Sequence, residues 1–261
     1  MRKIISQIFG YIAAVNFGFL QKYINKFYIN LFKIDMSEFK NYDEYKSLNE
    51  LFTRKLLKQR SFSLNDVDFI SPSDGLCLEC GTSNNSTALS IKGRSYDIKK
   101  LLDMSYEDGE FDYINIYLSP KNYHCYHCSC DMQILSALYI PGDLKSVNQK
   151  SLMRFDSVYE TNERVVLTCR YNDNFTFWLV FVGALNVGKM KFLFDERIQT
   201  NAKYMDKTFY EYENIFLKKG DMLGNFELGS TIVVLAKSGK IEPTLKAGDE
   251  IKFGDTIAKI L

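Results

Sequence analysis

The chain contains only two histidines, His124 and His127, and both lie in one short stretch, NYHCYHCSCD. An imidazole titrates near neutral pH, so it can serve as a general base or acid. On an extended strand the two side chains would point to opposite faces, whereas a turn or bulge between them would bring both to one site. The preceding Ser119-Pro120 favours such a loop edge. Functional residues are therefore expected here first, with a pair of structural histidines as the alternative.

Two further motifs supply groups that a histidine base could use. Asp74 lies in SPSDG, where a proline and a glycine flank one carboxylate in a tight loop, although a lone aspartate there would be an ordinary turn residue. Gly229-Ser230 immediately precedes Thr231 and the apolar run Ile232–Leu235, which is typical of a buried strand. Aspartate, histidine and serine from separate segments can act as orienter, base and nucleophile in any chain order.

A Gly-Ser pair next to a base has a specific chemistry available to it. The hydroxyl of Ser230 can attack the carbonyl of Gly229, the least hindered residue type, and convert the amide into an ester. β-Elimination then breaks the ester and leaves dehydroalanine, which water converts into a pyruvoyl group with release of ammonia. Gly-Ser alone is too common to support this reaction, so the other motifs must carry it.

Six cysteines are present: Cys77, Cys80, Cys125, Cys128, Cys130 and Cys169. In a chain of 261 residues this number does not indicate a disulfide scaffold, and reduced thiols in a cytosolic setting are expected. Cys77-x-x-Cys80 has zinc-ligand spacing, and His127, Cys128 and Cys130 could complete a site. Small buried apolar side chains are the favoured interpretation, because no second clean pair follows.

The composition excludes some classes of function. With 33 basic and 32 acidic residues the net charge is +1, which gives no support for nucleic-acid binding. Hydrophobic residues make up 46% of the chain, enough for a sizeable core. LKKGDMLGNF and LKAGDEIKFGD echo each other as hairpins of the kind found in biotinyl and lipoyl carriers, but neither presents a convincing lysine at its tip.

The first 65 residues are predicted to be helical. Apolar residues between Ile4 and Phe19, and again between Tyr23 and Phe32, recur at helical spacing, with Lys22 and Lys26 alongside the second group. Such helices suit a membrane interface, and packing on the protein's own core is the alternative. SLNELFTRKLL (residues 47–57) is predicted to form a helix that begins with a capping box.

From about Asp68 onward the pattern changes to short strands separated by turns. Strands are predicted at Ile114–Leu118, Ile134–Tyr139, Arg164–Arg170, Thr176–Val182, Met190–Phe194 and Ile232–Leu235, with one short helix at Asp97–Leu102. Gly-Asp pairs such as Gly220-Asp221 are predicted turns. The expected fold is α+β and mainly β: a sandwich- or barrel-like catalytic domain over residues 66–261, preceded by amphipathic helices over residues 1–65.

Taken together, these motifs resemble those of the phosphatidylserine decarboxylases, a pyruvoyl-dependent, self-processing family. The resemblance is carried, in chain order, by SLNELFTRKL, SPSDG, SPKNYHCYH, NERV, FVGALNVGKM and KKGDMLGNFELGST, and it covers nearly the whole chain. Departures are small: Ser73 stands where alanine is frequent, Cys125 where arginine is frequent, and Cys128 and Ser129 also differ.

The resemblance implies a role for each candidate residue. Ser230 is the self-cleavage nucleophile and becomes the pyruvoyl group, His127 is its base, and Asp74 orients His127. Gly229 ends the large chain, residues 1–229, and residues 230–261 form the small chain. His124 is the candidate to engage the substrate carboxylate or to supply the proton after decarboxylation.

The implied reaction converts phosphatidylserine to phosphatidylethanolamine through a Schiff base with the pyruvoyl group, without a metal or pyridoxal phosphate. The resemblance also implies a homodimer on the cytoplasmic side of the cell membrane, bound peripherally, which favours the interface for the N-terminal helices. Two alternatives stay open: a non-catalytic zinc-binding or carrier-like β module, and a decarboxylase of a related serine-headgroup lipid such as archaetidylserine.

Overall fold

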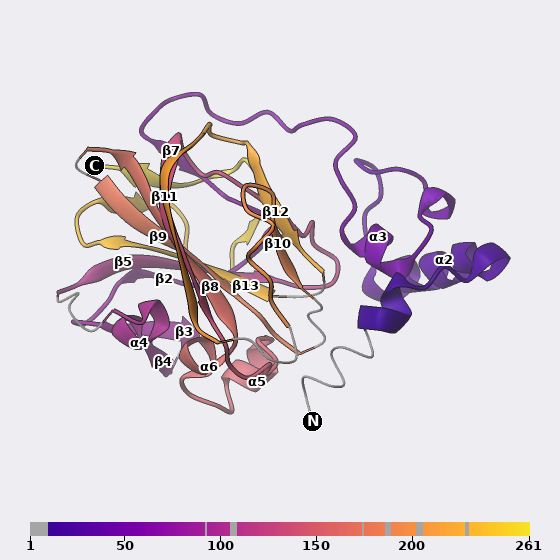
Figure 1. The fold of residues 1–261 in the computed structure, drawn as a ribbon, viewed down its shortest axis with the longest axis horizontal. Helices are drawn as coiled ribbons and strands as arrows, with labels where there is room; N and C mark the ends of the chain where they lie inside the picture. Colours follow the sequence, from indigo (N-terminus) through magenta and orange to yellow (C-terminus); the bar gives the residue numbers. More distant parts are fainter. Residues whose placement is uncertain are drawn as a thin grey trace.

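A helical N-terminal region lies beside a β-rich body in the computed structural model (Figure 1), which describes residues 10–91, 93–104, 109–173, 175–185, 189–201, 206–227 and 230–261. The N-terminal elements are η1 (Gly18–Leu20), α2 (Gln21–Phe32), η2 (Tyr42–Glu44) and α3 (Leu48–Phe52). An irregular segment, residues 53–67, leads from α3 to the first strand of the body. The predicted division at residue 65 falls within this segment.

Helix α2 turns its polar side chains inward. Gln21 and Asn25 are buried, and the Gln21 side chain donates to Asn25 Oδ1 at 2.7 Å. Asn25 Nδ2 donates to the carbonyl oxygens of Tyr42 and Tyr45 at 2.8 and 2.9 Å. These bonds anchor the helix to the following loop, because a buried amide needs its partners.

The opposite face of α2 is apolar and open to solvent. Tyr23, Phe27 and Leu31, spaced four residues apart on one helix face, are 60%, 67% and 58% exposed. The amphipathic helix is thus confirmed over residues 21–32, with its apolar stripe pointing away from the protein core. The predicted stripe between Ile4 and Phe9 lies outside the described residues. Among the residues that are described, no helix is long and apolar enough to cross a bilayer.

Helix α3 begins as predicted but ends early. Ser47 Oγ accepts the N–H of Glu50 at 3.1 Å, and the Glu50 carboxylate accepts the N–H of Lys46 at 2.7 Å, so the helix start is capped. The prediction that the helix reaches residue 57 was wrong. The chain leaves the helical path because the Arg54 guanidinium turns into the body, where it donates to the carbonyl oxygens of Lys121 and Asn122 at 2.7 and 2.9 Å.

The body is built on an eight-stranded antiparallel sheet. Its order is β11 (Thr208–Leu217), β7 (Met132–Ile140), β8 (Arg164–Asn172), β9 (Phe175–Val182), β13 (Ser230–Lys237), β5 (Phe111–Leu118), β2 (Gly75–Thr82) and β15 (Glu250–Ile251). Strand β13 lies near the centre, paired with β9 on one side and β5 on the other. The apolar run at Ile232–Leu235 is completely buried there, which confirms the predicted buried strand.

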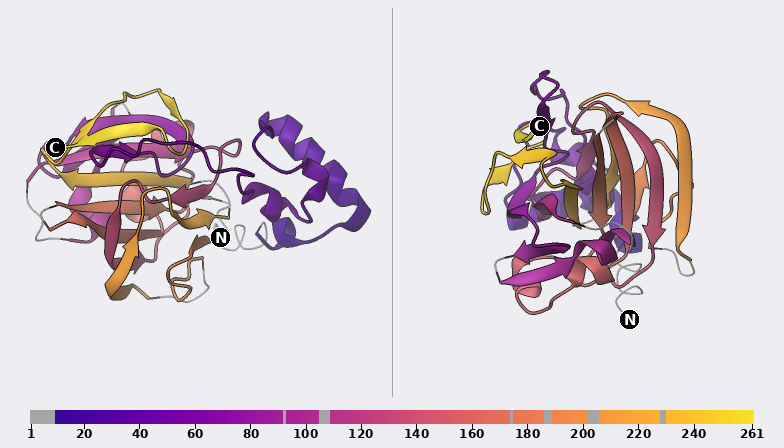
Figure 2. Two further views of the ribbon diagram at one scale, coloured as in Figure 1. Left: turned by 90° about the horizontal axis from the view of Figure 1, so that it is seen from above. Right: turned by 90° about the vertical axis from the view of Figure 1, so that its left-hand side faces the viewer.

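Three smaller sheets complete the body. The first has the order β1 (Asp68–Ile70), β16 (Thr256–Ile260), β14 (Ile241–Pro243); the second β10 (Met190–Phe192), β12 (Met222–Phe226), β6 (Cys125–His127); and the third is the pair β3 (Thr87–Ile91) and β4 (Arg94–Asp97). Helices α4 (Ile98–Leu102), α5 (Gln149–Leu152) and α6 (Val158–Thr161) gather with β3 and β4 at one side of the large sheet (Figures 1 and 2).

Two hydrophobic clusters lie on the two faces of the large sheet. Because side chains alternate along a strand, Ile232 and Val234 of β13 join one cluster with β6 and β12, whereas Val233 and Leu235 join the other with α4 and α6. The mainly β, sandwich-like α+β fold is therefore confirmed, and the histidine strand β6 packs on the same face of the sheet as Ile232.

Candidate active site

His127, the last residue of β6, is held at both ring nitrogens. Its Nδ1 lies 2.9 Å from the carbonyl oxygen of Gly220, and its Nε2 lies 3.0 Å from the hydroxyl of Tyr123. A carbonyl only accepts, so Nδ1 carries the proton and the Tyr123 hydroxyl donates to Nε2. Burial lowers the pKa of His127 to about 4. The positive charge of Arg60 also lowers this pKa, whereas the hydrogen bond to Gly220 and the negative charge of Asp74 raise it. His127 is therefore a neutral base at neutral pH.

The turn that supplies the Gly220 carbonyl depends on glycine. Gly220 has a φ of 83°, and a Cβ added there would lie 2.3 Å from the Phe62 ring. Asp221 N donates to the carbonyl of Lys218 at 2.9 Å, which closes the Gly-Asp turn that the sequence predicts. The backbone partner of His127 is thus fixed by a turn that another residue type could form only with strain.

Two aromatic rings fix the plane of the His127 imidazole. Phe253 stacks on it with ring centroids 3.8 Å apart and 15° between the planes. Tyr123 lies 5.8 Å away at 27°. These contacts exclude water from the ring, which is the physical cause of its low pKa.

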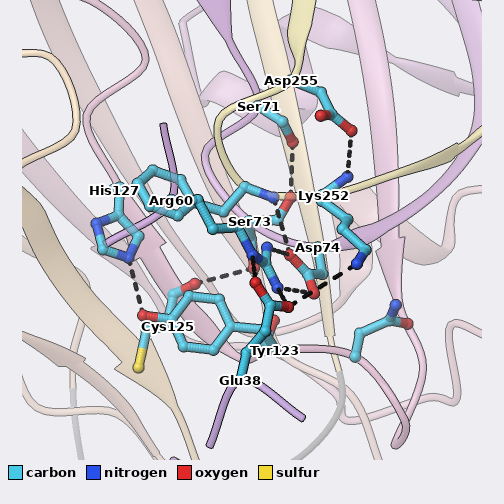
Figure 3. Close-up of polar contacts among 12 residues, drawn as sticks. Glu38, Arg60, Ser71, Ser73, Asp74, Tyr123, Cys125, His127, Lys252 and Asp255 are labelled. Atoms are coloured by element: carbon cyan, nitrogen blue, oxygen red, sulfur yellow. Dashed lines mark hydrogen bonds and ion pairs between the residues drawn. The ribbon is translucent and has the colours of Figure 1, made fainter. Parts of the chain in front are cut away.

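Asp74 is buried just before strand β2, and its carboxylate faces Arg60 (Figure 3). The two oxygens of Asp74 accept from Arg60 Nη1 at 2.5 Å and Nη2 at 3.2 Å. Oδ1 also accepts the backbone N–H of Phe253 at 2.8 Å. Among the described residues, no hydrogen bond joins Asp74 to His127. The structure instead connects them through Phe253, whose N–H bonds to Asp74 and whose ring stacks on His127.

Arg60 joins this site to the N-terminal region. Its Nε and Nη2 donate to the two oxygens of Glu38 at 2.8 Å each, so the guanidinium binds two carboxylates at once. Burial alone would lower the pKa of Arg60, but the bonds to Glu38 and Asp74 raise it. A pocket of about 480 Å³ opens beside this cluster and is lined by side chains of both charges, among them Lys33, Lys121 and Lys252.

Ser73 joins the SPSDG loop to the histidine strand. Its hydroxyl lies 2.9 Å from the carbonyl oxygens of both Tyr123 and Cys125, and His127 N donates to the carbonyl of Pro72 at 2.8 Å. These contacts hold Asp74 and His127 on adjacent segments although 53 positions separate them in the chain.

His124 is completely buried and keeps one nitrogen free. Its Nδ1 donates to the Asn122 carbonyl at 2.8 Å, so Nε2 carries a lone pair. Nε2 has no partner in the described part of the chain. The Phe52 ring of α3 lies 3.9 Å from the imidazole. Burial, with the Arg54 charge adding to it, lowers the pKa of His124 to about 3, so Nε2 can accept a hydrogen bond or a proton here but cannot donate one.

Ser230 opens strand β13 opposite Leu118 of β5, and it is completely buried. Its hydroxyl, like His124 Nε2, makes no hydrogen bond to the residues that the structure describes. Gly229, the other half of the predicted cleavage site, lies outside the described residues. On the N-terminal side of Gly229, the backbone N–H of Phe226 donates to the carbonyl oxygen of His124 at 3.0 Å. The segments before and after the Gly-Ser pair are thus anchored separately, to β6 and to β5.

The structure therefore brings Asp74 and His127 into one cluster and leaves Ser230 without a described bond to either histidine. It also reveals Arg60, Tyr123 and Phe253, which sequence reasoning missed. Tyr123 could have been noticed, because it stands inside the histidine motif. Arg60 and Phe253 carry no local signal. No group of three or more histidine, cysteine or acidic side chains suited to a metal occurs within the described ranges.

Comparison with known proteins gives the family. A family model described as phosphatidylserine decarboxylase matches residues 48–259. The phosphatidylserine decarboxylase proenzyme of Campylobacter jejuni is 53% identical over 262 residues, covering 97% of each chain, and that of Helicobacter pylori is 44% identical over 258 residues, covering 98% of this chain and 96% of the relative. The mitochondrial proenzyme of Cricetulus griseus is 31% identical, covering 99% of this chain and 72% of the relative. This chain belongs to the phosphatidylserine decarboxylase family of carboxy-lyases.

Proposed function

We propose that this chain is a proenzyme that cleaves itself between Gly229 and Ser230, converts Ser230 into a pyruvoyl group, and decarboxylates phosphatidylserine to phosphatidylethanolamine. The family membership supports the overall reaction. The observation that carries the self-cleavage is the Ser230 hydroxyl, which is completely buried, unbonded among the described residues, and located where a buried strand begins. A buried hydroxyl without a partner is costly, which supports a chemical role for Ser230.

Main-chain pairing would hold a group formed at Ser230 in its place. The described neighbours are held by main-chain pairing to β5 and β9, so the N-terminal end of β13 keeps its place after the chain is cut. When formed, the pyruvoyl group supplies the electron sink that stabilises the carbanion left by departing CO₂. Formation of the pyruvoyl group makes residue 230 the first residue of a new chain. The seven following residues of β13 remain in the sheet.

His127 serves as the base in the self-cleavage. Its neutral state and its lone pair at Nε2 support this role, because a serine hydroxyl must lose its proton as it attacks the Gly229 carbonyl. In the uncut chain the Tyr123 hydroxyl is hydrogen-bonded to Nε2. The Ser230 hydroxyl would therefore have to replace it as the hydrogen-bond partner of Nε2 when cleavage occurs. Asp74 orients His127 by holding the backbone of Phe253, whose ring stacks on the imidazole, rather than by a direct bond.

His124 is proposed to act on the substrate. Its unprotonated Nε2 is a hydrogen-bond acceptor in a water-free environment, so it would bind the protonated amine of the serine headgroup, or take up a proton and return it to the carbanion. The low pKa of His124 argues against a permanent positive charge that would bind the carboxylate. An apolar site also favours loss of a charged carboxylate.

The lipid is proposed to reach the enzyme at a membrane surface. The exposed face of α2, with Tyr23, Phe27 and Leu31, supports insertion into the headgroup region, and Lys22 and Lys26 are exposed beside it to bind anionic lipid. The enzyme would bind peripherally, on the cytoplasmic side of the cell membrane. The pocket beside Arg60 is lined by residues of both the N-terminal region and the body, and we propose that it admits the headgroup.

Intact-protein mass spectrometry on the purified full chain tests the self-cleavage. We expect two species, residues 1–229 and 230–261, the smaller one carrying a pyruvoyl group in place of Ser230. Ser230→Ala and His127→Ala should give one uncut chain, whereas Ser238→Ala, an exposed turn serine in the same segment, should be processed normally. An uncut wild-type chain, or a cut elsewhere, would disprove the proposed site.

The substrate is tested separately, with the processed enzyme and vesicles of defined composition. Release of CO₂ from phosphatidylserine vesicles, with phosphatidylethanolamine as the product, is expected for the wild type and not for Ser230→Ala. Vesicles that carry serine on an ether-linked archaeal lipid test the alternative substrate. Faster turnover of that lipid would replace phosphatidylserine in the proposal and leave the self-cleavage intact.

A further inference from the structure

The Cys77-x-x-Cys80 motif lies on strand β2, where a β-bulge changes which way its side chains point. Cys77 is paired with Ile116 of β5 and Cys80 with Ile114, and the register shifts between Cys77 and Glu79. Without the bulge, residues three apart on a strand would face opposite sides. The extra residue places both cysteines on one face, and accordingly both pack against the same hydrophobic cluster as Ile114 and Ile116.

The two thiols are direct neighbours. The neighbouring thiol is the largest cause of the pKa shift of each. Their ladder partners are two residues apart, and at a rise of about 3.3 Å per residue this corresponds to about 6.6 Å between α-carbons. Disulfides span about 4.4–6.8 Å between α-carbons. The estimated spacing of Cys77 and Cys80 therefore lies at the upper end of the α-carbon range of disulfides.

Exposure separates Cys80 from the other five cysteines. Cys80 is only partly buried, whereas Cys77, Cys125, Cys128, Cys130 and Cys169 are buried. The bond from Cys77 lowers the pKa of Cys80, and the same contact raises the pKa of Cys77. Burial raises the pKa of Cys169 and of the three cysteines in the histidine motif. Cys80 is thus the thiol that a soluble reagent can reach and that most readily forms a thiolate.

We propose that Cys77 and Cys80 form a reversible dithiol–disulfide pair that reacts with small soluble disulfides such as oxidised glutathione. The Cys80 thiolate attacks one sulfur of the oxidant, forms a mixed disulfide and releases the first thiol. Cys77 then loses its proton and attacks the Cys80 sulfur, which releases the second thiol. The protein loses two protons and two electrons, and the oxidant takes them up to become two thiols.

Oxidation has a defined structural consequence. The Cys80 thiol donates to the carbonyl of Leu245 at 3.2 Å, and Gly248 N donates to the carbonyl of Cys77 at 2.8 Å. A disulfide removes the S–H donor and therefore the bond to Leu245. The 245–249 segment, which leads into β15, should become more mobile in the oxidised protein, and this does not depend on the proposed decarboxylation.

Mass spectrometry after thiol blocking tests the pair. The full chain is incubated with oxidised glutathione, alkylated under denaturing conditions and digested. We expect a Cys77–Cys80 peptide that has lost two hydrogens and is restored by dithiothreitol, with the other four cysteines fully alkylated. Amide hydrogen exchange at residues 245–249 should rise on oxidation. Ser230→Ala should behave identically, which separates this result from self-cleavage.

Three variants make the test decisive. Cys77→Ser should stop at a stable glutathione adduct on Cys80, and Cys80→Ser should not react. Cys169→Ser, a buried cysteine of β8, is the matched control and should form the disulfide like the wild type. A wild-type chain that accumulates only the Cys80 adduct, that links other cysteines, or that does not react would overturn the proposal.

Discussion

The imidazole of His127 stacks on the ring of Phe253 at 3.8 Å, and the backbone N–H of Phe253 donates to Asp74 at 2.8 Å. Asp74 thus reaches His127 through a residue 179 positions away in the chain rather than by a direct bond. In the proposed mechanism this contact sets the plane in which Nε2 accepts the serine proton.

Phe253→Leu tests this relay, because leucine keeps the backbone N–H and much of the volume but removes the ring. An aromatic contact contributes about 0.5–1.5 kcal/mol beyond its buried area, so self-cleavage should slow by about two- to tenfold. The rate is read from the loss of uncut chain on a gel. Phe209→Leu, on the exposed face of β11, is the control. Equal rates in the two variants would mean that the stacking does not position His127.

The limits of sequence reasoning follow from these contacts. Apolar runs predicted β5, β9 and β13 because those strands are buried on both faces. Strand β11 was not predicted, since it lies at the sheet edge and its residues alternate between exposed and half-buried. The motifs located Asp74, His127 and Ser230. Nothing local marks Arg60 or Phe253, because their roles arise only when distant segments pack together.

Arg60→Ala should be the most destabilising change at the site. It leaves the Asp74 carboxylate buried with only one backbone donor, and breaking a buried pair costs about 3–5 kcal/mol. Arg60→Lys keeps the charge but not the planar guanidinium that binds a carboxylate through two hydrogen bonds. Its free energy of unfolding should lie between those of Arg60→Ala and the unchanged chain. Urea unfolding of the uncut Ser230→Ala protein gives the free energies of unfolding.

The matched control is Arg94→Ala. Arg94 and Asp156 form a pair whose side chains are 37% and 58% exposed, and such pairs contribute at most about 1 kcal/mol. If Arg60→Ala and Arg94→Ala lower the free energy of unfolding equally, Arg60 does not hold Asp74 in solution.

Acid should affect stability and self-cleavage in different pH ranges. The pKa of His127 is about 4 in the folded chain and near 6.5 when unfolded. Between these values the unfolded state binds more protons, so stability falls as the pH drops from 6.5 to 4. Self-cleavage needs the neutral imidazole, so its rate constant should stay level until the pH approaches 4 and then fall.

Unfolding of Ser230→Ala at a series of pH values tests the stability part, and His127→Asn in the same background should show a smaller slope between pH 6.5 and 4. The rate constant is measured on the wild type at the same pH values. A rate constant that already falls at pH 6.5 would show that His127 is not shielded from water as the stacked rings imply.

Tyr123→Phe should leave self-cleavage intact and make it faster. The Tyr123 hydroxyl donates to Nε2 at 3.0 Å, which stabilises the neutral imidazole and covers the lone pair that must accept the Ser230 proton. Removing the hydroxyl frees Nε2 and raises the pKa of His127, so the acid limb of the rate profile should move to higher pH. A variant that cannot cleave at all would show that Tyr123 passes the proton instead of covering Nε2.

Phe27→Ser should weaken membrane binding without changing the fold. Phe27 is 67% exposed on α2, so its replacement by serine costs little stability, but a buried phenylalanine gains about 1.5–3 kcal/mol from leaving water. Flotation with phosphatidylserine-containing vesicles should therefore show binding weakened by about tenfold or more. Phe209→Ser is the control, because Phe209 is 60% exposed but lies on β11, away from α2. If the two variants bind vesicles equally, α2 is not the membrane-facing element, and its apolar face must contact something other than lipid.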